Sequence, residues 1–153
     1  ELKDLEKAIK KAKKEYNVEG VITGALFSNY QRERIEKVAD KLSLKIFSPL
    51  WHLSQETEMR EILNEGFRFI ITKIAAEGLD KSWLCKEITE KDIDKLIELN
   101  KRIGINIAFE GGEAETLVIA GPIFKKELII KDAEIIMENE NTGLYKIKKV
   151  RLK

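Results

Sequence analysis

Three carboxylates surround a glycine pair in the segment E-G-G-E-A-E-T at residues 110–116. Adjacent glycines permit backbone conformations that other residues rarely adopt. Crowded carboxylates are costly to ionise together unless a cation or a proton donor is held between them. The segment is therefore a candidate catalytic or substrate site, and a solvated glycine turn is the alternative.

A second group of polar residues, S-N-Y-Q-R-E-R-I-E at 28–36, follows an expected buried strand. The free backbone N–H groups at the start of a helix favour an anion, and Arg32 or Arg34 could bind a phosphate with two hydrogen bonds. The alternative is a solvated helix face of Arg–Glu pairs, with Ser28 and Gln31 acting only as a cap.

Four single residues could also contact a ligand. Trp51 and Trp83 fall in loops at the expected ligand-binding edge, although packing between subdomains is favoured for Trp83. A lone histidine such as His52 is usually a hydrogen-bonded loop residue, and the sequence identifies no base that would activate Cys85. One His and one Cys cannot build a Cys/His zinc site, so we assign no metal ligands.

The elements that must position these residues alternate in the first half of the chain. Helices are expected at residues 2–16, from Ser28 and from Ser54, and strands at residues 18–23, 44–47 and 67–76. This alternation is typical of a parallel, doubly wound sheet, in which ligands bind beyond the carboxyl ends of the strands. We therefore expect an α/β fold with a partial Rossmann-like parallel sheet.

The second half predicts an α+β subdomain. A helix is expected at residues 89–103 with Gly104 as its cap, followed by strands at 106–109, 117–120, 127–137 and 144–152. The last two strands should be antiparallel because residues 139–143 are rich in turn formers. We place the boundary between Pro49 and Trp51, which divides the chain into residues 1–50 and 51–153.

Composition narrows the class of protein. The 153 residues include 28 Lys+Arg and 27 Asp+Glu, a net charge of +1, so no global field attracts nucleic acid or an anionic membrane. No apolar run approaches the roughly 20 residues that span a bilayer. We expect a cytoplasmic protein with no nucleic-acid or membrane partner. The high proportion of Lys, Glu and Ile is typical of heat-adapted proteins.

Several strings together resemble one family. They are G-A-L-F-S-N-Y-Q-R-E-R-I-E (24–36), P-L-W (49–51), N-E-G-F (64–67), G-L-D-K-S-W-L (78–84) and E-G-G-E-A-E-T (110–116). In this order they resemble the diphthine–ammonia ligases, N-type ATP pyrophosphatases of the adenine nucleotide alpha hydrolase-like (HUP) superfamily. By this resemblance we expect an archaeal member of the family.

The resemblance implies an activity. ATP would activate the carboxylate of diphthine on translation elongation factor 2, and ammonia from ammonium would give the amide, with AMP and pyrophosphate released. ATP and Mg²⁺ are the implied cofactors, and a homodimer is one oligomeric state to consider.

The resemblance also implies roles for individual residues. The nucleotide side would be lined by Gly24, Ala25, Ser28, Gln31, Arg32 and Arg34. The substrate side would include Trp51, Trp83, Gly111, Gly112 and Thr116. Catalytic roles fall to Glu110, Glu113 and Glu115.

Two departures from the family qualify this reading. The pyrophosphate-binding loop S-G-G-K-D-S is absent, and the chain begins at Glu1 inside a helical pattern. We therefore expect a piece of a longer enzyme that does not turn over ATP by itself. Cys85 stands where glycine is more usual. The alternatives are a non-catalytic nucleotide-sensing module and a pyrophosphatase acting on another carboxylate.

The chemistry of diphthine suggests how it would be held. Its quaternary ammonium cannot donate an N–H hydrogen bond and suits aromatic faces and negative charge. Our hypothesis is that Trp51 or Trp83 receives this group together with Glu113 or Glu115. Removal of a proton from ammonium by one of the glutamates is a second role that the sequence leaves open.

Overall fold

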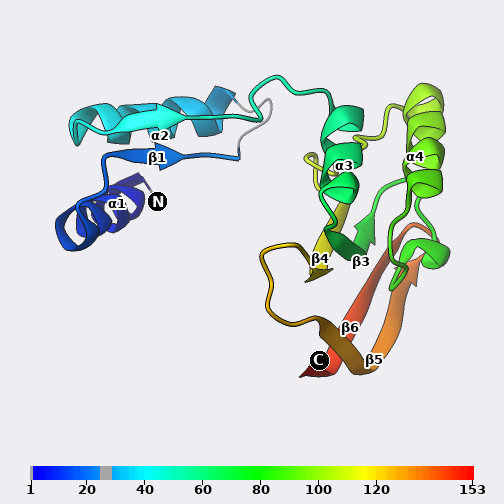
Figure 1. The fold of residues 1–153 in the computed structure, drawn as a ribbon. Coiled ribbons are helices and arrows are strands. Elements are labelled where there is room, and N and C mark those ends of the chain that lie inside the picture. Colours follow the sequence, from blue (N-terminus) through cyan, green and yellow to red (C-terminus); the bar gives the residue numbers. More distant parts are fainter. Residues whose placement is uncertain (1, 25–28) are drawn as a thin grey trace. The chain divides into compact units, whose positions relative to one another are not determined.

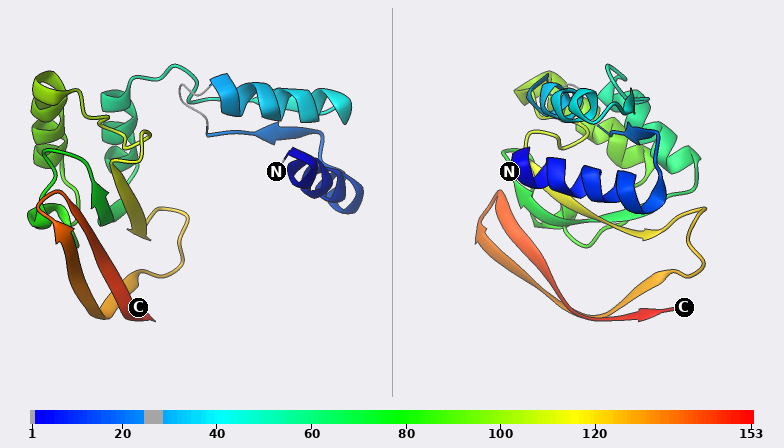
Figure 2. Two further views of the ribbon diagram at one scale, coloured as in Figure 1. Left: turned by 180° about the vertical axis from the view of Figure 1, so that it is seen from behind. Right: turned by 90° about the vertical axis from the view of Figure 1, so that its left-hand side faces the viewer.

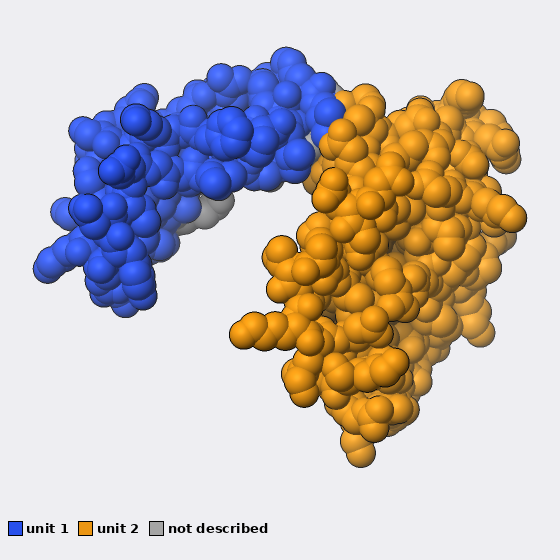
Figure 3. Space-filling model, in the orientation of Figure 1, with its two compact units in different colours: residues 1–53 blue, residues 54–153 orange. Residues whose placement is uncertain are grey.

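The computed structural model describes residues 2–24 and 29–153. The chain divides into two compact units, residues 1–53 and 54–153, which Figure 3 colours separately. The division falls between Leu53 and Ser54, whereas the sequence placed it between residues 50 and 51. No helix in the described ranges has the length and apolar character needed to cross a bilayer.

The first unit is a small α/β arrangement. Its elements are α1 (Leu2–Tyr16), β1 (Gly20–Ile22), α2 (Asn29–Lys41) and β2 (Lys45–Phe47). Strands β1 and β2 pair in parallel, as expected, and the helix α2 forms the crossover that parallel strands require. Val38, Ala39 and Leu44 are the buried apolar side chains described in this unit.

The second unit is built on an antiparallel sheet. Its elements are α3 (Gln55–Asn64), β3 (Arg68–Ala75), a 3₁₀ turn (Lys81–Trp83), α4 (Glu90–Ile103), β4 (Ala114–Ala120), β5 (Leu128–Asn139) and β6 (Thr142–Leu152). The strand order is β4-β3-β6-β5. Helices α3 and α4 lie side by side against the sheet, as the two views of Figure 2 also show. Met59, Ile71, Ile74, Ile93 and Leu96 are among the core side chains between these layers.

Residues 67–76 do not join the parallel sheet, so this part of the expected fold is wrong. Strand β3 instead pairs antiparallel with β4 and with β6. Its side chains Phe69, Ile70, Ile71 and Ile74 are buried. A continuous apolar run of this kind is compatible with the centre of either kind of sheet, so its pattern cannot identify the neighbouring strands.

The expected strand at residues 106–109 is also wrong, because these residues form a turn. Phe109 is buried and has a φ of 63°, which an extended strand does not permit. In contrast, the helix that ends at Ile103 before Gly104 (φ 76°) and the antiparallel pairing of β5 with β6 are confirmed.

Cys85 gives a stability prediction. Its φ is 58°, a left-handed conformation that costs a residue with a Cβ atom about 1–2 kcal/mol, and its N–H is held by the carbonyl of Ile71 at 3.0 Å. We expect Cys85→Gly to raise the free energy of unfolding by roughly 0.5–1 kcal/mol, because the gain is partly offset by the greater entropy of unfolded glycine. Chemical denaturation measures the change. Cys85→Ala is the control, since it keeps the Cβ atom, and equal gains in both variants would contradict the explanation.

Candidate functional site

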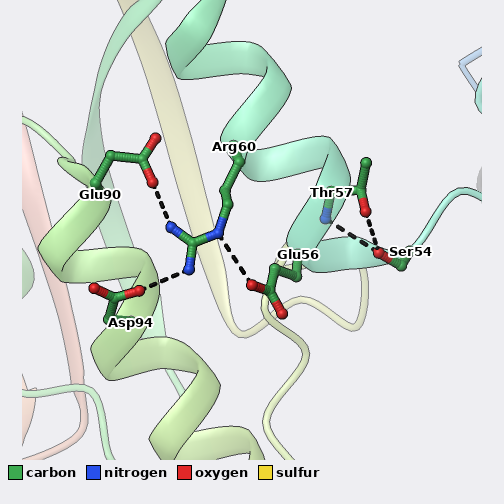
Figure 4. Close-up of polar contacts among 6 residues, drawn as sticks. All are labelled: Ser54, Glu56, Thr57, Arg60, Glu90 and Asp94. Atoms are coloured by element: carbon green, nitrogen blue, oxygen red, sulfur yellow. Dashed lines mark hydrogen bonds and ion pairs between the residues drawn. The ribbon is translucent and has the colours of Figure 1, made fainter.

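The first turn of α3 is fixed by its own cap and by α4 (Figure 4). Ser54 Oγ accepts a hydrogen bond from the N–H of Thr57 at 3.1 Å. The guanidinium of Arg60 binds three carboxylates, one on α3 and two on α4: Glu56 at 3.0 Å, Asp94 at 2.6 Å, and Glu90. These contacts hold Gln55, the first residue of α3, in one place relative to α4.

Gln55 reaches from α3 to the loop before E-G-G-E. Its side-chain Oε1 accepts a hydrogen bond from the N–H of Ile107 at 2.9 Å, across 52 positions of sequence. Asn106 contributes from within the loop, where its Oδ1 accepts from the N–H groups of Ala108 at 3.0 Å and Glu110 at 3.2 Å. The loop backbone is therefore held by side chains in place of a neighbouring strand.

Glu113 completes this arrangement. Its Oε1 accepts from the N–H of Asn106 at 3.3 Å, and its Oε2 accepts from the N–H of Gly111 at 2.9 Å. We call the three side chains of Gln55, Asn106 and Glu113 the amide clamp. Together they satisfy five backbone N–H groups of residues 106–111, which removes the cost of leaving such groups without partners.

The glycine pair fits this clamp for two separate reasons. A Cβ atom on Gly111 would lie 2.5 Å from Oε1 of Glu113, so a side chain at this position would require the carboxylate to move out of the clamp. Gly112 has a φ of 90°, a conformation that residues other than glycine rarely adopt. The spacing E-G-G-E is thus explained by a turn that closes onto its own second glutamate.

The three predicted catalytic glutamates have different surroundings. Both carboxylate oxygens of Glu113 are occupied by backbone N–H groups. Glu115, on β4, forms an ion pair with Lys73 at 3.0 Å. The exposed carboxylate of Glu110 accepts no hydrogen bond from the described residues. Thr116 is exposed on β4, opposite Ile71.

Glu58 on α3 lies close enough to Glu110 for their charges to interact. Its Oε2 is buried and has no hydrogen-bond partner among the described residues. Burial, and secondarily the charge of Glu110, raises the pKa of Glu58 to about 7. The structure therefore places near Glu110 an acid that is partly protonated near neutrality.

The predicted nucleotide side belongs to the first unit. Nε of Arg32 donates to Oε1 of Glu36 at 2.5 Å, and its guanidinium carbon lies 4.8 Å from the ring centroid of Trp51. The ring of Trp51 also stacks on His52 at 4.8 Å. Trp51, which we predicted on the substrate side, thus lies with the predicted nucleotide-binding Arg32.

The remaining predicted residues are less closely grouped. The guanidinium of Arg34 lies 4.5 Å from the ring centroid of Tyr30, and Gly24 is exposed. Trp83 is 7% exposed and lies in the core of the second unit, which favours packing over a ligand contact, although the packing is not the contact between subdomains that we expected. The predicted residues Ala25 and Ser28 and the side chain of Gln31 lie outside what the structure describes.

The described residues contain no group of three or more His, Cys, Asp or Glu side chains that could hold a metal ion. Sequence reasoning missed Gln55, Glu58 and Asn106. Gln55 and Glu58 lie on a helix far along the chain from the loop, and no sequence pattern connects them with it. Asn106 carried a weak signal, because Asn commonly accepts hydrogen bonds from the backbone N–H two residues later.

The clamp predicts a stability effect. Gln55→Ala should lower the free energy of unfolding by about 1–2 kcal/mol, because the N–H of Ile107 loses its acceptor in a part-buried position. Gln55→Glu, which keeps the acceptor oxygen, should lose less than half of this. Urea denaturation measures both variants, and equal losses would show that the hydrogen bond is unimportant.

The raised pKa of Glu58 predicts that the free energy of unfolding depends on pH. Its pKa rises from 4.5 to about 7 on folding, so its neutral form favours the folded state, and this contribution is lost as the pH rises from about 4.5 through 7. Glu58→Gln should therefore gain stability over the parent at pH 8, by about 1 kcal/mol after solvent screening, and little at pH 4. Thermal unfolding across this range measures the difference. Glu61→Gln, an exposed change on the same helix, should show no such trend, and a parallel trend would exclude Glu58 as the cause.

Two domain families match the chain. Residues 54–152 match the diphthamide synthase C-terminal domain, and residues 1–46 match the diphthamide synthase N-terminal domain.

Curated relatives agree with these matches. The chain is 36% identical to the human diphthine–ammonia ligase over 139 residues, which is 91% of this chain and 52% of the relative. It is 38% identical to the mouse diphthine–ammonia ligase, with 91% and 52% covered, and 39% identical to that of Schizosaccharomyces pombe, with 95% and 24% covered. The chain thus spans about half the length of the mammalian relatives, and less of the yeast protein. With its second unit matched almost from end to end, the chain belongs to the diphthamide synthase family.

Proposed function

We propose that the protein to which this chain belongs is an ATP-dependent amide ligase. It would convert diphthine on translation elongation factor 2 to diphthamide, using ammonium and releasing AMP and pyrophosphate. The observation that carries the proposal is the clamped E-G-G-E loop, which lies in the unit that matches the diphthamide synthase C-terminal domain. Relatives that match both units carry the name diphthine–ammonia ligase.

The clamp suggests different roles for the glutamates. Glu113 uses both oxygens to hold the backbone, so it suits a positioning role. Glu110 is exposed, projects from the loop that Glu113 holds, and keeps its carboxylate oxygens available to a ligand. We assign to Glu110 the removal of a proton from ammonium, which leaves the ammonia nitrogen with the electron pair that attacks the activated carboxylate.

The first unit would contribute to binding of the nucleotide. Its parallel pair of strands with the α2 crossover supports assignment to the distal part of a Rossmann-like, HUP-type domain. Arg32 lies in the first turn of α2 and could reach a phosphate if it exchanged its bond to Glu36. Mg²⁺ would accompany ATP, and the described residues supply no evident set of ligands for it.

The quaternary ammonium of diphthine also needs a binding place. The exposed carboxylate of Glu110, next to the partly buried Glu58, offers negative charge without requiring an N–H donor. Trp51 keeps the aromatic surface that such a group favours, although Arg32 already lies over its ring. We therefore retain Trp51 as a substrate-binding candidate, and we no longer favour Trp83 because it is a core residue.

AMP formation by the complete gene product tests the function. AMP should accumulate only when ATP, ammonium and diphthine-bearing elongation factor are all present. Glu110→Gln should lower kcat by about 100-fold, in the range of lost general-base catalysis, with little change in the KM for ATP. Glu98→Gln, an exposed change on α4, is the matched control and should behave like the parent.

Other results would identify other functions. AMP formation with unrelated carboxylic acids in place of the factor would indicate a different substrate. Nucleotide binding without any turnover would indicate a sensing module. If Glu110→Gln kept the kcat of the parent across pH 6–9 while AMP formation still required all three substrates, the ligase would stand and the role of Glu110 would be wrong.

A further inference from the structure

Positive charge is concentrated at one end of the second unit. The chain as a whole is nearly neutral, but residues 145–153 contain five basic residues and no Asp or Glu. Lys146 and Lys148 share one carboxylate, that of Glu134, at 3.9 and 2.6 Å. Arg151 and Lys153 form no ion pair within the described part of the chain. The excess charge therefore lies at the carboxyl end of β6.

The fold adds two further lysines to this end. Strands β5 and β6 are in register from Leu128 opposite Leu152, and the N–H of Lys153 donates to the carbonyl of Glu127 at 2.9 Å. This pairing brings the last residue of the chain beside Lys125 and Lys126, and Figure 1 shows the C-terminus near the start of β5. A cavity of about 500 Å³ is lined by Lys125, Lys126 and Lys153 together with other residues of this end.

The nearby carboxylates are already bound. Arg68, which also lines the cavity, forms two hydrogen bonds to Glu87 at 2.7 and 2.9 Å and one to Glu127 at 3.2 Å. Lys125 and Lys126, like Lys153, form no ion pair in the described ranges. Arg68 and its two carboxylates carry one net negative charge, so the three exposed ammonium groups leave this end with a net charge of +2.

Exposed apolar side chains accompany the lysines. Ile123 is 78% exposed and Phe124 is 46% exposed, and both immediately precede Lys125. Aliphatic side chains gain nothing from a phosphate backbone, whereas protein interfaces combine an apolar centre with a charged rim. A second copy of this chain is disfavoured, because a symmetric contact would place like charges against one another. The chemistry favours a different protein with an acidic surface.

The separation of this surface from the E-G-G-E loop, measured along β4, indicates the size of the partner. β4 begins directly after the E-G-G-E loop and ends at Ala120, where the segment that leads to Ile123 starts. Its seven extended residues separate the two ends by roughly 20 Å. A ligand that contacts the loop and the lysines at the same time must span this distance and is therefore macromolecular.

We propose that the surface formed by Ile123, Phe124, Lys125, Lys126 and Lys153 docks an acidic surface of the protein substrate while its modified histidine is at the E-G-G-E loop. This inference rests on the proposed function, since it takes a protein as the substrate. Binding occurs away from the reacting atoms, so the surface determines the affinity for the whole protein and not the rate of the chemical step.

The test is binding of the 153-residue chain to diphthine-bearing elongation factor, which requires no turnover. The triple variant Lys125→Glu, Lys126→Glu, Lys153→Glu should bind about tenfold more weakly or worse at low salt, and its affinity should depend less on salt than that of the parent. The control reverses three exposed charges on α1, Lys3→Glu, Lys7→Glu and Lys10→Glu, and should bind like the parent. Circular dichroism of each variant verifies folding.

Activity of the complete gene product separates the two proposals. With docking lost, the KM for the factor should rise about tenfold while kcat changes by less than about twofold, since remote charges affect encounter and affinity. Equal affinities of the triple variant and the parent would overturn the docking surface while AMP formation still supported the ligase. Absence of AMP formation by the parent would reject the ligase instead. Loss of binding to RNA or to phosphatidylserine vesicles, with binding to the factor unchanged, would also overturn the proposal.

Discussion

The turn at residues 106–113 depends on acceptors for its backbone N–H groups. A strand obtains these acceptors from a neighbouring strand and a helix from its own carbonyls, but an irregular turn packed against a core has neither. Here the oxygens of Gln55, Asn106 and Glu113 replace them. The turn therefore has one fixed conformation although its backbone is irregular. A site that must present a carboxylate in one orientation needs such a fixed backbone.

Other features of the second unit support this clamp. Gln55 can act only if the first turn of α3 stays in place, and the cap of Ser54 and the guanidinium of Arg60 keep it there. Helices α3 and α4 are held in turn by the core that they share with β3. The carbonyl of Glu113 accepts from the N–H of Ala75, which joins the end of the turn directly to the sheet. The core, helices α3 and α4 and the turn are thus connected to one another by direct contacts.

The division of polar groups between the units is consistent with the proposed ligase, which would bind a nucleotide and a protein substrate. The first unit gathers an arginine, an aromatic ring and the start of a helix, which are groups suited to an anion. The second unit gathers carboxylates at one end of β4 and uncompensated lysines at the other. A nearly neutral total charge conceals this arrangement, because opposite charges that are separated along one strand cancel in a sum but not at a binding surface.

The sequence by itself determined the family, most of the helices and the antiparallel β5–β6 pair, and it identified the E-G-G-E segment as a candidate site, because caps, turns and hydrophobic periods depend on near neighbours. Only the tertiary structure decided which strands accompany β3, since an apolar run does not specify its neighbours. It also decided that Glu113 binds the backbone, that Glu58 lies beside Glu110, and that Trp83 is a core residue. These facts depend on contacts such as that of Gln55 with Ile107, whose partners are 52 positions apart and are brought together only by packing.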